Sequence, residues 1–494
     1  MSAGILLSAL FDGLVADVPD CHVPDMTSDS RQVVPGGLFI ACRGVHQHGL
    51  EYLPEALAAG AGAVAWEPEA GLAAPEVPRG VVVFPVDMLG EQLGMIADRF
   101  FAMPSSAMSV TGITGTNGKT TTAWLLAQAM QHLSVSSAYM GTLGFGLMPA
   151  GVVPAALTTP GVISVHRRLR GMADAGAQFV AMEVSSHGLD QGRVDGMRFS
   201  TVAFTNLTRE HLDYHATMAA YAEAKQRLFI EFKFESAVIN VANDFGRELA
   251  DLLHKDVHLL TVSTDSAVPA SLHAELLAIG ADGLHVRFSD KHGEAELHSS
   301  LWGRFNVENL LVAAGILMVS GITLNDAIWA LAKCGAPAGR MELIGGEASQ
   351  PLVIVDFAHT PDALDKALTT VRDHCSGAIW CVFGCGGDRD QGKRSEMAEV
   401  VSRCADFAIV TDDNPRHESP EKIVADILQG FSADAHAEVV HDRAAAIGKA
   451  VASAAHGDVV FIAGKGAESY QLEGDLAHPF SDRDVASRAL EAAA

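Results

Sequence analysis

A glycine-rich run between a predicted strand and a predicted helix constrains the fold of this chain most. From Ser109 the apolar residues SVTGI predict a strand, and TTAWLLAQAMQHL at 121–133 predicts a helix. The run TGITGTNGKTTT joins the two. A strand, a tight glycine-rich loop and a helix in this order are typical of an open parallel sheet, and the amides of such a loop can bind phosphates. The run therefore predicts an α/β fold with a phosphate site.

Apolar segments that predict strands recur along the whole chain, with helical stretches between them. The first hundred residues hold β-rich runs at 38–42, 62–66 and 80–86, and a helical stretch at 53–61. The strands predicted further along cover residues 178–185, 201–207, 236–243, 257–263, 352–357, 378–384, 407–412, 438–441 and 458–464. This alternation indicates α/β architecture with mainly parallel sheets.

The length of the chain requires more than one domain. Hydrophobic cores stop growing near about 250 to 300 residues, and the chain has 494. The segment FFAMPSSAM is typical of a linker, and CGAPAGRME supplies glycine and proline before the last group of strands. We predict a small N-terminal α/β domain over 1–106, a central P-loop-type domain with helices on both faces of a mainly parallel sheet over 107–337, and a C-terminal Rossmann-like domain over 338–494.

Charge and cysteine content argue against several classes of protein. A formal charge of -26 opposes binding to polyanions, so we expect no nucleic-acid partner. The seven cysteines are scattered without Cys-x-x-Cys spacing, which indicates buried thiols in a reducing compartment. The most apolar run, 310–324, is shorter than the ~20 residues of a membrane span, and the N-terminus lacks the positive region of a signal peptide. We expect a cytoplasmic, monomeric protein without membrane insertion.

The glycine-rich loop carries the residue types that bind a nucleoside triphosphate. Lys119 is placed to reach the terminal phosphates, and Thr120 to ligate magnesium. The predicted nucleotide-binding residues of the loop are Gly115, Thr116, Asn117, Gly118, Lys119, Thr120 and Thr121. The spacing departs from a strict Walker A pattern, because Ile113 stands where glycine is expected six residues before the lysine. A glycine-rich turn that binds nothing is the alternative.

Polar residues also end or follow two other predicted strands. Glu183 ends the strand FVAMEV, and His211 lies in NLTREHLDYH, just after the strand TVAFTN. Ligands of open parallel sheets bind at the carboxyl ends of the strands, and carboxylates are hard ligands for magnesium. A solvated strand end is the alternative for Glu183. Taken alone, a loop histidine such as His211 is more often a surface or capping residue, and imidazole is an unusual magnesium ligand. Beside the phosphate loop, we predict that both help to hold the metal.

A series of motifs in a fixed order resembles the Mur ligase family over essentially the whole chain. The series comprises GTNGKTT, the strand ending in Glu183, NLTREHLDYH, YAEAKQRLF, GRFNVEN, AGRME and DFAHTPDAL. The N-terminal TSDSRQVVPGGLFIACRG, followed by HQHG, is similar to the UDP-sugar-binding domain of the third and fourth amino-acid-adding enzymes, and MEVSSHGL is similar to the third. DNPR at 413–416 resembles the signature of the branch that uses meso-diaminopimelate.

The resemblance implies an ATP-dependent amide-bond ligase of peptidoglycan synthesis, and with it a role in cell wall biogenesis, cell shape and cell division. It implies that meso-2,6-diaminopimelate is added to the D-glutamyl side-chain carboxylate of UDP-N-acetylmuramoyl-L-alanyl-D-glutamate through an acyl phosphate, with release of ADP. The implied partners are these small molecules, ATP and Mg²⁺. The alternatives are a lysine-adding ligase of the same family, a folylpolyglutamate synthase, or a P-loop phosphotransferase that makes no amide.

Matching motifs also imply which residues bind each substrate. The uridine nucleotide would contact Ser28, Ser30, His46, Gln47 and His48. The muramoyl-dipeptide end would contact Thr158, Thr159, Ser185, Gln191 and Arg193. ATP would contact Lys119, Asn306, Arg340 and Asp356. Diaminopimelate would contact Arg389, Asp413, Asn414, Pro415, Arg416, Gly464 and Glu468.

The resemblance assigns Lys225 a role that its own pattern does not indicate. Lys225 in YAEAK matches a carbamylated lysine of the family, which holds a second magnesium with Glu183 and His211, while Thr120 serves the first. Taken alone, Lys225 reads as a lysine on the surface of a helix. The implied catalytic residues are Lys119, Glu183, His211 and Lys225.

Charge is the expected basis of amino-acid choice. The far end of diaminopimelate carries an ammonium and a carboxylate, and Arg416 can take that carboxylate in a bidentate bond while Glu468 receives the ammonium. The alternative is that Arg416 pairs with a nearby acid such as Glu418. The chain departs from the family pattern at Ala467, where members commonly carry histidine.

Overall fold

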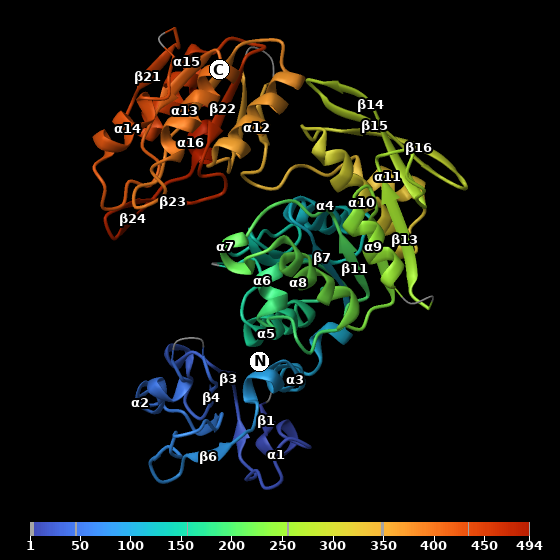
Figure 1. Cartoon of the computed structure of the whole chain (residues 1–494), viewed down its shortest axis with the longest axis vertical. Coiled ribbons are helices and arrows are strands. Elements are labelled where there is room, and N and C mark those ends of the chain that lie inside the picture. The colour runs from blue at the N-terminus through green and yellow to red at the C-terminus, as the bar shows by residue number, and fades with distance from the viewer. Residues whose placement is uncertain are drawn as a thin grey trace. The chain divides into compact units, whose positions relative to one another are not determined.

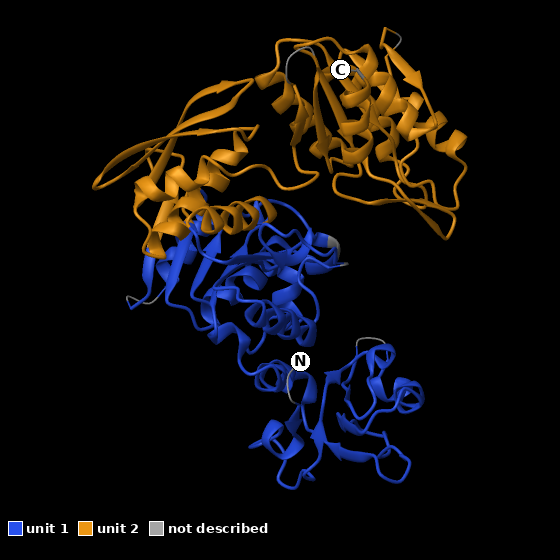
Figure 2. Ribbon diagram, turned by 180° about the vertical axis from the view of Figure 1, so that it is seen from behind, with its two compact units in different colours: residues 1–119, 134–239, 243–259 blue, residues 120–133, 240–242, 260–494 orange. Residues whose placement is uncertain are grey.

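The computed structural model describes residues 4–44, 47–155, 157–253, 256–346, 350–432 and 434–493. Figure 1 shows strands and helices alternating along the chain, which confirms the predicted α/β class. The chain divides into two compact units, coloured separately in Figure 2: unit 1 holds residues 1–119, 134–239 and 243–259, and unit 2 holds residues 120–133, 240–242 and 260–494. Within the described ranges, no helix has both the length and the apolar character that crossing a bilayer requires.

The N-terminal part of unit 1 is built on a small parallel sheet. Its four strands lie in chain order: β3 (Met26–Thr27), β4 (Leu38–Ala41), β5 (Ala63–Trp66) and β6 (Val82–Pro85). Alternate residues of β4 and β5 pack in two separate clusters, one with helix α2 (Leu53–Ala58) and the other with helix α3 (Leu89–Phe100). The remaining short elements are β1 (Ile5–Leu6), α1 (Leu7–Leu10), β2 (His22–Val23), η1 (Ser30–Gln32), η2 (Gly49–Tyr52) and η3 (Pro104–Ser106).

The second sheet region of unit 1 positions the predicted nucleotide loop. Its strands are β7 (Ser109–Thr114), β8 (Ser137–Gly141), β9 (Gly144–Leu147), β10 (Phe179–Glu183), β11 (Thr201–Phe204) and β12 (Ser236–Asn240). They lie in the order β12-β11-β7-β10-β8-β9, and all pairs are parallel except β8 with β9. The helices of this region are α5 (Val162–Asp174), α6 (Ser186–Asp190), α7 (Leu212–His215), α8 (Met218–Ile230) and α9 (Asp244–Leu252).

Unit 2 contains an antiparallel region that the sequence patterns did not predict. Strands β14 (Leu272–Gly280), β15 (Gly283–Asp290) and β16 (Gly293–Ser299) form a meander, and the end of β13 (His258–Ser263) pairs with β14 in parallel. The helices of this region are α4 (Lys119–His132), α10 (Phe305–Val319) and α11 (Leu324–Leu331). Most of α10 is buried, as expected for the most apolar run of the chain.

The last part of unit 2 is a doubly wound sheet. Its strands are β17 (Glu342–Gly345), β18 (Leu352–Asp356), β19 (Ile379–Phe383), β20 (Phe407–Val410), β21 (Ala437–Val439) and β22 (Val459–Ala463). The order is β17-β18-β22-β19-β20-β21, and only the β17 pairing is antiparallel among the described strands of this sheet.

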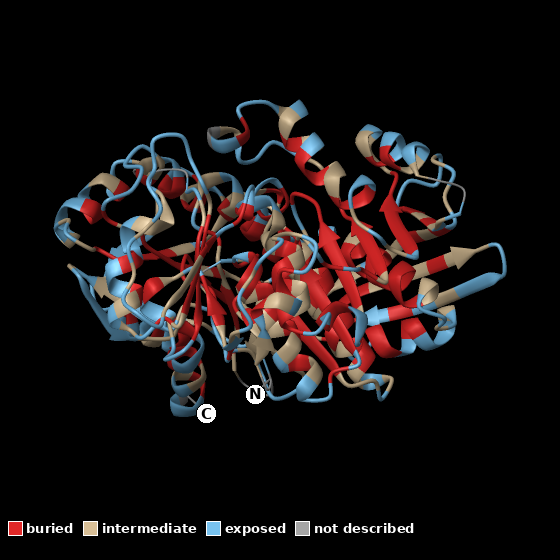
Figure 3. Cartoon of the chain, turned by 90° about the horizontal axis from the view of Figure 1, so that it is seen from below, coloured by how far each residue is buried: buried red, intermediate tan, exposed pale blue. Residues whose placement is uncertain are grey.

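Helices cover both faces of that sheet, and its four inner strands, β18, β22, β19 and β20, are mostly buried (Figure 3). Ile354 and Phe461 pack in one cluster with helices α12 (Pro361–His374), α13 (Lys393–Cys404) and α14 (Pro420–Leu428). Val353 and Val460 point the other way, toward α15 (Arg443–Ser453) and α16 (Asp482–Ala493). A hairpin of β23 (Tyr470–Glu473) and β24 (Leu476–Pro479) follows the last strand of the sheet. The Rossmann-like architecture predicted for this region is therefore confirmed, while the three domain boundaries stay a prediction.

Candidate active site

Three strand ends meet at one edge of the sheet in unit 1. Strand β7 lies between β10 and β11 and is parallel to both, with Ile113 opposite Glu183 and Thr114 opposite Phe204. The glycine-rich loop, Glu183 and the segment leading to His211 therefore start from neighbouring strand ends. This is the place where open parallel sheets bind ligands.

Hydrogen bonds join the glycine-rich loop to the segment that follows β11. The backbone N–H of Thr116 donates to Asn206 O at 2.8 Å, and the N–H of Asn117 donates to Asn206 Oδ1 at 2.9 Å. Gly115 has a φ of 148°, and a Cβ on it would lie 1.9 Å from Thr205 Oγ1. Only glycine fits here, both by conformation and by space.

Two lysine ammonium groups converge on one carbonyl oxygen of the loop. Lys119 Nζ donates to Gly115 O at 2.9 Å and to Thr116 O at 2.7 Å, and Lys225 Nζ donates to Gly115 O at 2.7 Å. Like charges at this spacing repel each other, so an anion bound beside them would be stabilised. The loop is therefore suited to a triphosphate.

Lys225 is buried, so its interpretation as a surface lysine is wrong. Its residue is 1% exposed, and its Nζ lies 4.3 Å from the centroid of the Tyr221 ring. Burial, followed by the charge of Lys119, lowers the pKa of Lys225 well below its usual value. A lysine with a lowered pKa carries a larger fraction of neutral, nucleophilic amine near neutral pH.

Glu183 is held in one orientation by neighbours that sequence reasoning missed. Tyr139 Oη donates to Glu183 Oε1 at 2.5 Å, and the backbone N–H of Thr142 donates to the same oxygen at 2.8 Å. Thr142 Oγ1 donates to Oε2 at 3.2 Å. A Cβ on Gly141 would lie 2.1 Å from Oε1, so glycine there leaves room for the carboxylate. Glu183 and Tyr139 are fully buried.

His211 is exposed and lies beside His187 and Tyr221. It adopts a φ of 55°, its ring centroid is 4.8 Å from that of His187 and 6.0 Å from that of Tyr221, and its Nε2 lies 3.6 Å from Glu210 Oε2. A non-glycine residue with positive φ is uncommon and is often found at functional sites. Tyr221 thus contacts both His211 and Lys225.

The donor set suits a hard cation that keeps much of its water. Across the part of the chain that the structure describes, no three His, Cys, Asp or Glu side chains converge to enclose a metal. Magnesium uses one or two protein carboxylates and completes its shell with waters and substrate phosphates. Glu183 and the hydroxyl of Thr120 are donors of this kind, so the residues present fit magnesium better than a softer metal.

The five residues predicted for the muramoyl-dipeptide end lie around Glu183 and the helix that follows it: Thr158, Thr159, Ser185, Gln191 and Arg193. Thr159 Oγ1 donates to Glu183 O and accepts the N–H of Ser185, both at 3.1 Å. Arg193 donates to Thr159 O at 2.8 Å and, through Nε, to Gln191 Oε1 at 3.0 Å. Thr158 Oγ1 lies 3.0 Å from Thr142 Oγ1. The structure therefore brings this set together.

The residues predicted for the uridine nucleotide lie in the N-terminal sheet region. Ser28 is exposed, whereas Ser30 is buried and donates to Glu55 Oε2 at 2.6 Å. Gln47 accepts a bond from Tyr52 Oη at 2.6 Å. His48 caps η2 by accepting the N–H of Leu50 at 3.1 Å. His46 lies outside the described residues.

Three residues outside the glycine-rich loop that are predicted to bind ATP lie in unit 2: Asn306, Arg340 and Asp356. Two of them, Asn306 and Asp356, form hydrogen bonds with other protein atoms. Asn306 is buried and donates to Trp302 O at 2.7 Å. Asp356 accepts the N–H groups of Met341 and Ala358, each at 2.8 Å, and burial raises its pKa. Arg340 stacks over Phe357 with its guanidinium carbon 4.9 Å from the ring centroid.

Two loops at the edge of the last sheet carry the arginines predicted to bind the amino acid. Arg416 Nη1 donates to Gly387 O at 2.8 Å. A Cβ on Gly386 would lie 2.8 Å from Arg416 Nη1 and 3.8 Å from Arg389 Cγ, so both arginines flank this glycine. The loops after β19 and β20 thus bring Arg389 and Arg416 together.

Glu418 pairs with Arg394, whereas the alternative interpretation of Arg416 requires Glu418 to pair with Arg416. Arg394, which is fully buried, donates from Nη2 to Glu418 Oε2 at 2.5 Å, and the N–H of Asp388 donates to the same oxygen at 3.1 Å. The Arg394 bond holds the pKa of Glu418 at about 2. The Arg394 pair therefore joins α13 to the loop after β20, and the Asp388 bond joins the loops after β19 and β20. Glu418 bonds to Arg394 and not to Arg416.

The far side of the same region holds Asp413, Asn414, Gly464 and Glu468. Asn414 Nδ2 donates to Glu468 Oε2 at 3.0 Å. Gly464 has a φ of 113°, a conformation that favours glycine, and it lies beside Asp413, whose Oδ2 would be 2.7 Å from an added Cβ. The seven residues predicted for diaminopimelate therefore lie on loops at the carboxyl ends of β19, β20 and β22.

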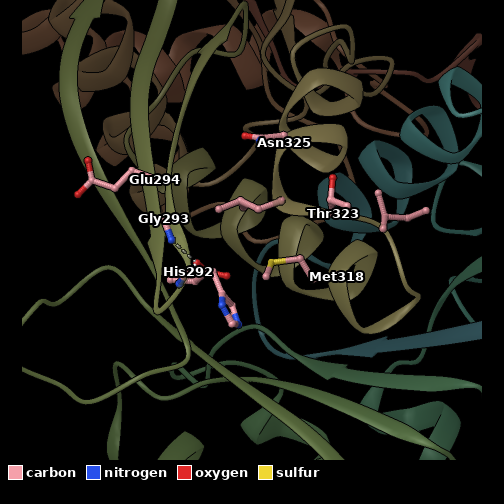
Figure 4. A pocket seen from close by; sticks show the side chains of 9 residues that line it. His292, Gly293, Glu294, Met318, Thr323 and Asn325 are labelled. Atoms are coloured by element: carbon pink, nitrogen blue, oxygen red, sulfur yellow. Dashed lines mark hydrogen bonds between the residues drawn. The ribbon is translucent and has the colours of Figure 1, made fainter.

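A hollow elsewhere in unit 2 contains none of the predicted residues. It has a volume of about 360 Å³ and lies between the β15–β16 turn and the ends of α10 and α11, as Figure 4 shows. Its lining includes Asp290, Glu294, Met318 and Thr323. The carboxylate of Asp290 accepts hydrogen bonds from the N–H groups of His292 and Gly293, so it stabilises the turn between β15 and β16.

If Glu183 holds magnesium, replacing Tyr139 with phenylalanine should raise the magnesium concentration needed for half-maximal activity roughly 10- to 100-fold, the range for loss of a residue that orients a metal ligand. The phenolic hydroxyl holds Glu183 Oε1, and its loss lets the carboxylate turn. Titration of activity with Mg²⁺ at saturating substrates measures the effect. An unchanged magnesium dependence with a lower melting temperature would show that the hydroxyl serves stability alone.

Comparison with known proteins agrees with the motif series and the fold. Family models match residues 22–101 (Mur ligase family, catalytic domain), 113–317 (Mur ligase middle domain) and 339–466 (Mur ligase, glutamate ligase domain). A protein of Xanthomonas campestris named UDP-N-acetylmuramoyl-L-alanyl-D-glutamate--2,6-diaminopimelate ligase is 47% identical over 492 residues, covering 99% of this chain and 98% of the relative. A protein of Xylella fastidiosa with the same name is 46% identical, covering 97% of each.

Solved structures give the same result. A structure described by that enzyme name superposes with a TM-score of 0.73 at 33% sequence identity and covers 99% of both chains. The matched segments, the relatives of nearly equal length and the strand-end site agree with one another. This chain belongs to the Mur ligase family.

Proposed function

We propose that the protein joins meso-2,6-diaminopimelate to the D-glutamyl side-chain carboxylate of UDP-N-acetylmuramoyl-L-alanyl-D-glutamate, with conversion of ATP to ADP and phosphate. One observation carries the proposal. A phosphate loop, Glu183 and the buried Lys225 meet at adjacent strand ends, in a chain that aligns over nearly its full length with relatives bearing the name of this enzyme. The reaction is a step of peptidoglycan precursor synthesis, and it takes place where ATP is available, in the cytoplasm.

The chemistry follows from the poor reactivity of a carboxylate at neutral pH. A carboxylate oxygen of the acceptor attacks the γ-phosphorus of ATP, ADP leaves, and an acyl phosphate forms. The free amine of diaminopimelate then attacks the acyl carbon, and the tetrahedral intermediate expels phosphate to leave the amide, while the amine proton passes to solvent. Both steps bring anionic groups together: the acceptor carboxylate, the phosphates of ATP and the phosphate that leaves. The main tasks of the protein are therefore to position these groups and to stabilise their negative charge.

Lys119 supplies positive charge at the loop. In the described structure both ammonium groups bond to Gly115 O, which is a substitute partner for the phosphate oxygens that Lys119 would contact. Glu183, Thr120 and His211 would hold magnesium, which would supply positive charge to offset that of the phosphates. Thr159, Ser185 and Arg193 would hold the acceptor beside Glu183.

We further propose that Lys225 acts as a carbamate. Carbon dioxide reacts with a neutral amine, and burial lowers the pKa of Lys225 so that more neutral amine is present. The product is a carboxylate-like anion, which would replace the repulsion between Lys119 and Lys225 with attraction. It would also add an oxygen donor close to His211, where the described side chains alone are too few to enclose a metal.

Arg389, Arg416 and Glu468 would bind the two ends of the amino acid. The names of the relatives and the DNPR loop favour diaminopimelate over lysine. Lysine would present a lone cation to Arg416, whereas diaminopimelate presents a carboxylate. A phosphotransferase that makes no amide offers no reason for this second charged site.

Phosphate release tests the proposal directly. We expect release from Mg-ATP only when UDP-N-acetylmuramoyl-L-alanyl-D-glutamate and meso-diaminopimelate are both present, with L-lysine a poor substitute. Mass spectrometry should show the new amide in the same reaction. Phosphate release at an equal rate with or without the amino acid would favour the phosphotransferase, and equal rates with lysine would favour the lysine-adding enzyme. Size-exclusion chromatography with light scattering tests the expected monomer.

A further inference from the structure

A buried cation, Lys465, lies within the group of residues proposed to bind the amino acid. It directly follows Gly464 at the end of β22, and it has no solvent exposure. Its Nζ donates to Asn414 Oδ1 and to Glu468 Oε2, each at 3.0 Å. Its Nζ also lies 5.6 Å from the centroid of the Tyr470 ring. A buried ammonium is costly unless charged or polar partners surround it, and Asn414 and Glu468 are the hydrogen-bond partners of Lys465.

Lys465 and Asn414 together fix the carboxylate of Glu468. Asn414 Oδ1 accepts from Lys465 and from the N–H of Leu472 at 2.9 Å, so its Nδ2 must face Glu468, to which it donates at 3.0 Å. Both bonds to Glu468 end on Oε2. Among the described residues none donates a hydrogen bond to Oε1, so that oxygen can face a ligand.

Lys465 also balances the charge of this region. Asp413 lies beside Gly464, and burial raises the pKa of Asp413 while Arg443 and Lys465 oppose that rise. Arg443 is already committed, because it donates two bonds to Asp482 at 2.7 and 2.8 Å in a fully buried pair. Lys465 therefore adds to Arg443 a second positive charge that offsets Asp413, and it bonds directly to Glu468.

We propose that Lys465 is a specificity-determining residue that tunes the pocket toward an amino acid whose far end carries both an ammonium and a carboxylate. The inference rests on the proposed function. With Lys465 present, Glu468 is partly neutralised and attracts a lone ammonium only weakly. Without it, the pocket gains one negative charge, which attracts lysine and repels the far carboxylate of diaminopimelate.

The test compares two amino acids on one preparation of each variant. Lys465→Met, which keeps the length of the side chain, is assayed by phosphate release with meso-diaminopimelate and with L-lysine, and Lys465→Gln provides a milder variant. We expect the ratio of kcat/KM for diaminopimelate to kcat/KM for lysine to fall roughly 10- to 100-fold, the size of one charged hydrogen bond. The ratio is independent of the folded fraction, because both substrates meet the same enzyme.

Lys366→Met is the matched control, because Lys366 lies on the surface of α12 and pairs only with Asp362 among the described residues. Its ratio should equal that of the wild type. A Lys465→Met variant that loses activity equally toward both amino acids would overturn the inference and leave Lys465 a structural residue. Wild-type protein that responds to neither amino acid would instead overturn the proposed function, and the inference with it.

A double variant tests the route through Glu468. If Lys465 acts by orienting and neutralising Glu468, then Lys465→Met should change the ratio much less in a Glu468→Gln background than in the wild type. An undiminished change in that background would contradict the role assigned to Lys465 as a positioning residue for Glu468.

Discussion

Replacing Lys225 with alanine is expected to lower kcat for amide formation roughly 100- to 1,000-fold, the range for loss of one preorganised electrostatic group. Lys225 is 1% exposed and bonds to Gly115 O at 2.7 Å, directly beneath the phosphate loop. Its removal deletes either a carbamate that helps to hold magnesium or a cation beside the triphosphate. Steady-state phosphate release at saturating substrates measures the loss.

The matched control for this variant is Lys233→Ala. Lys233 is an exposed lysine of unit 1 that follows helix α8, so its removal changes the net charge equally but leaves the loop intact. Its activity should stay within about twofold of the wild type, as is usual for a surface substitution. Full activity of the Lys225 variant would remove this residue from the mechanism.

Chemical rescue separates the two possible forms of Lys225. If the carbamate is the working form, removal of carbon dioxide should slow the wild-type enzyme, and a short carboxylic acid such as formate should partly restore Lys225→Ala. Peptide mass analysis under carbon dioxide should show the adduct on Lys225. An alanine variant that formate does not restore, together with a wild type indifferent to carbon dioxide, would assign the ammonium form instead.

The buried strands of the parallel regions were predictable because they are nearly continuous apolar runs. Strand β22 is buried at all five positions, and β10 likewise, so their sequences carry a clear signal. The antiparallel meander of β14 to β16 was missed for the opposite reason. Its strands alternate irregularly between buried and exposed residues, and a bulge between Leu276 and Ala278 breaks the alternation in β14.

Residues of the candidate site also differ in how far the local sequence indicates their position. The positions of Glu183 and His211 near the glycine-rich loop were predictable, because a polar residue at or just beyond the end of an apolar strand is a local pattern. Lys225 reads locally as a surface lysine, and only packing of α8 against β7 and the loop buries it, so its role came from the family resemblance alone. Tyr139 and Lys465 had no local signal, because their importance depends on which carboxylate the fold places beside them.

Replacing Arg416 with alanine should remove most of the preference for diaminopimelate over lysine. The protein holds Arg416 at a φ of 51°, a conformation that is costly for a non-glycine residue and that persists here because two backbone bonds fix it. The N–H of Arg416 donates to Leu472 O at 3.1 Å, and Arg416 O accepts the N–H of Gly474 at 2.8 Å. The hairpin of β23 and β24 therefore presents the guanidinium, and Arg394 keeps Glu418 from competing for it.

A charged hydrogen bond of ~1.5 to 3 kcal/mol corresponds to a roughly 10- to over 100-fold difference, so Arg416→Ala should lower the ratio of kcat/KM for diaminopimelate to that for lysine by this factor. Arg403→Ala, on the exposed side of α13, is the control and should leave the ratio unchanged. The kcat for diaminopimelate should fall less than its kcat/KM, because the bond forms at the far end of the substrate and not at the reacting amine. An unchanged ratio in Arg416→Ala would mean that another residue, such as Arg389, binds the far carboxylate.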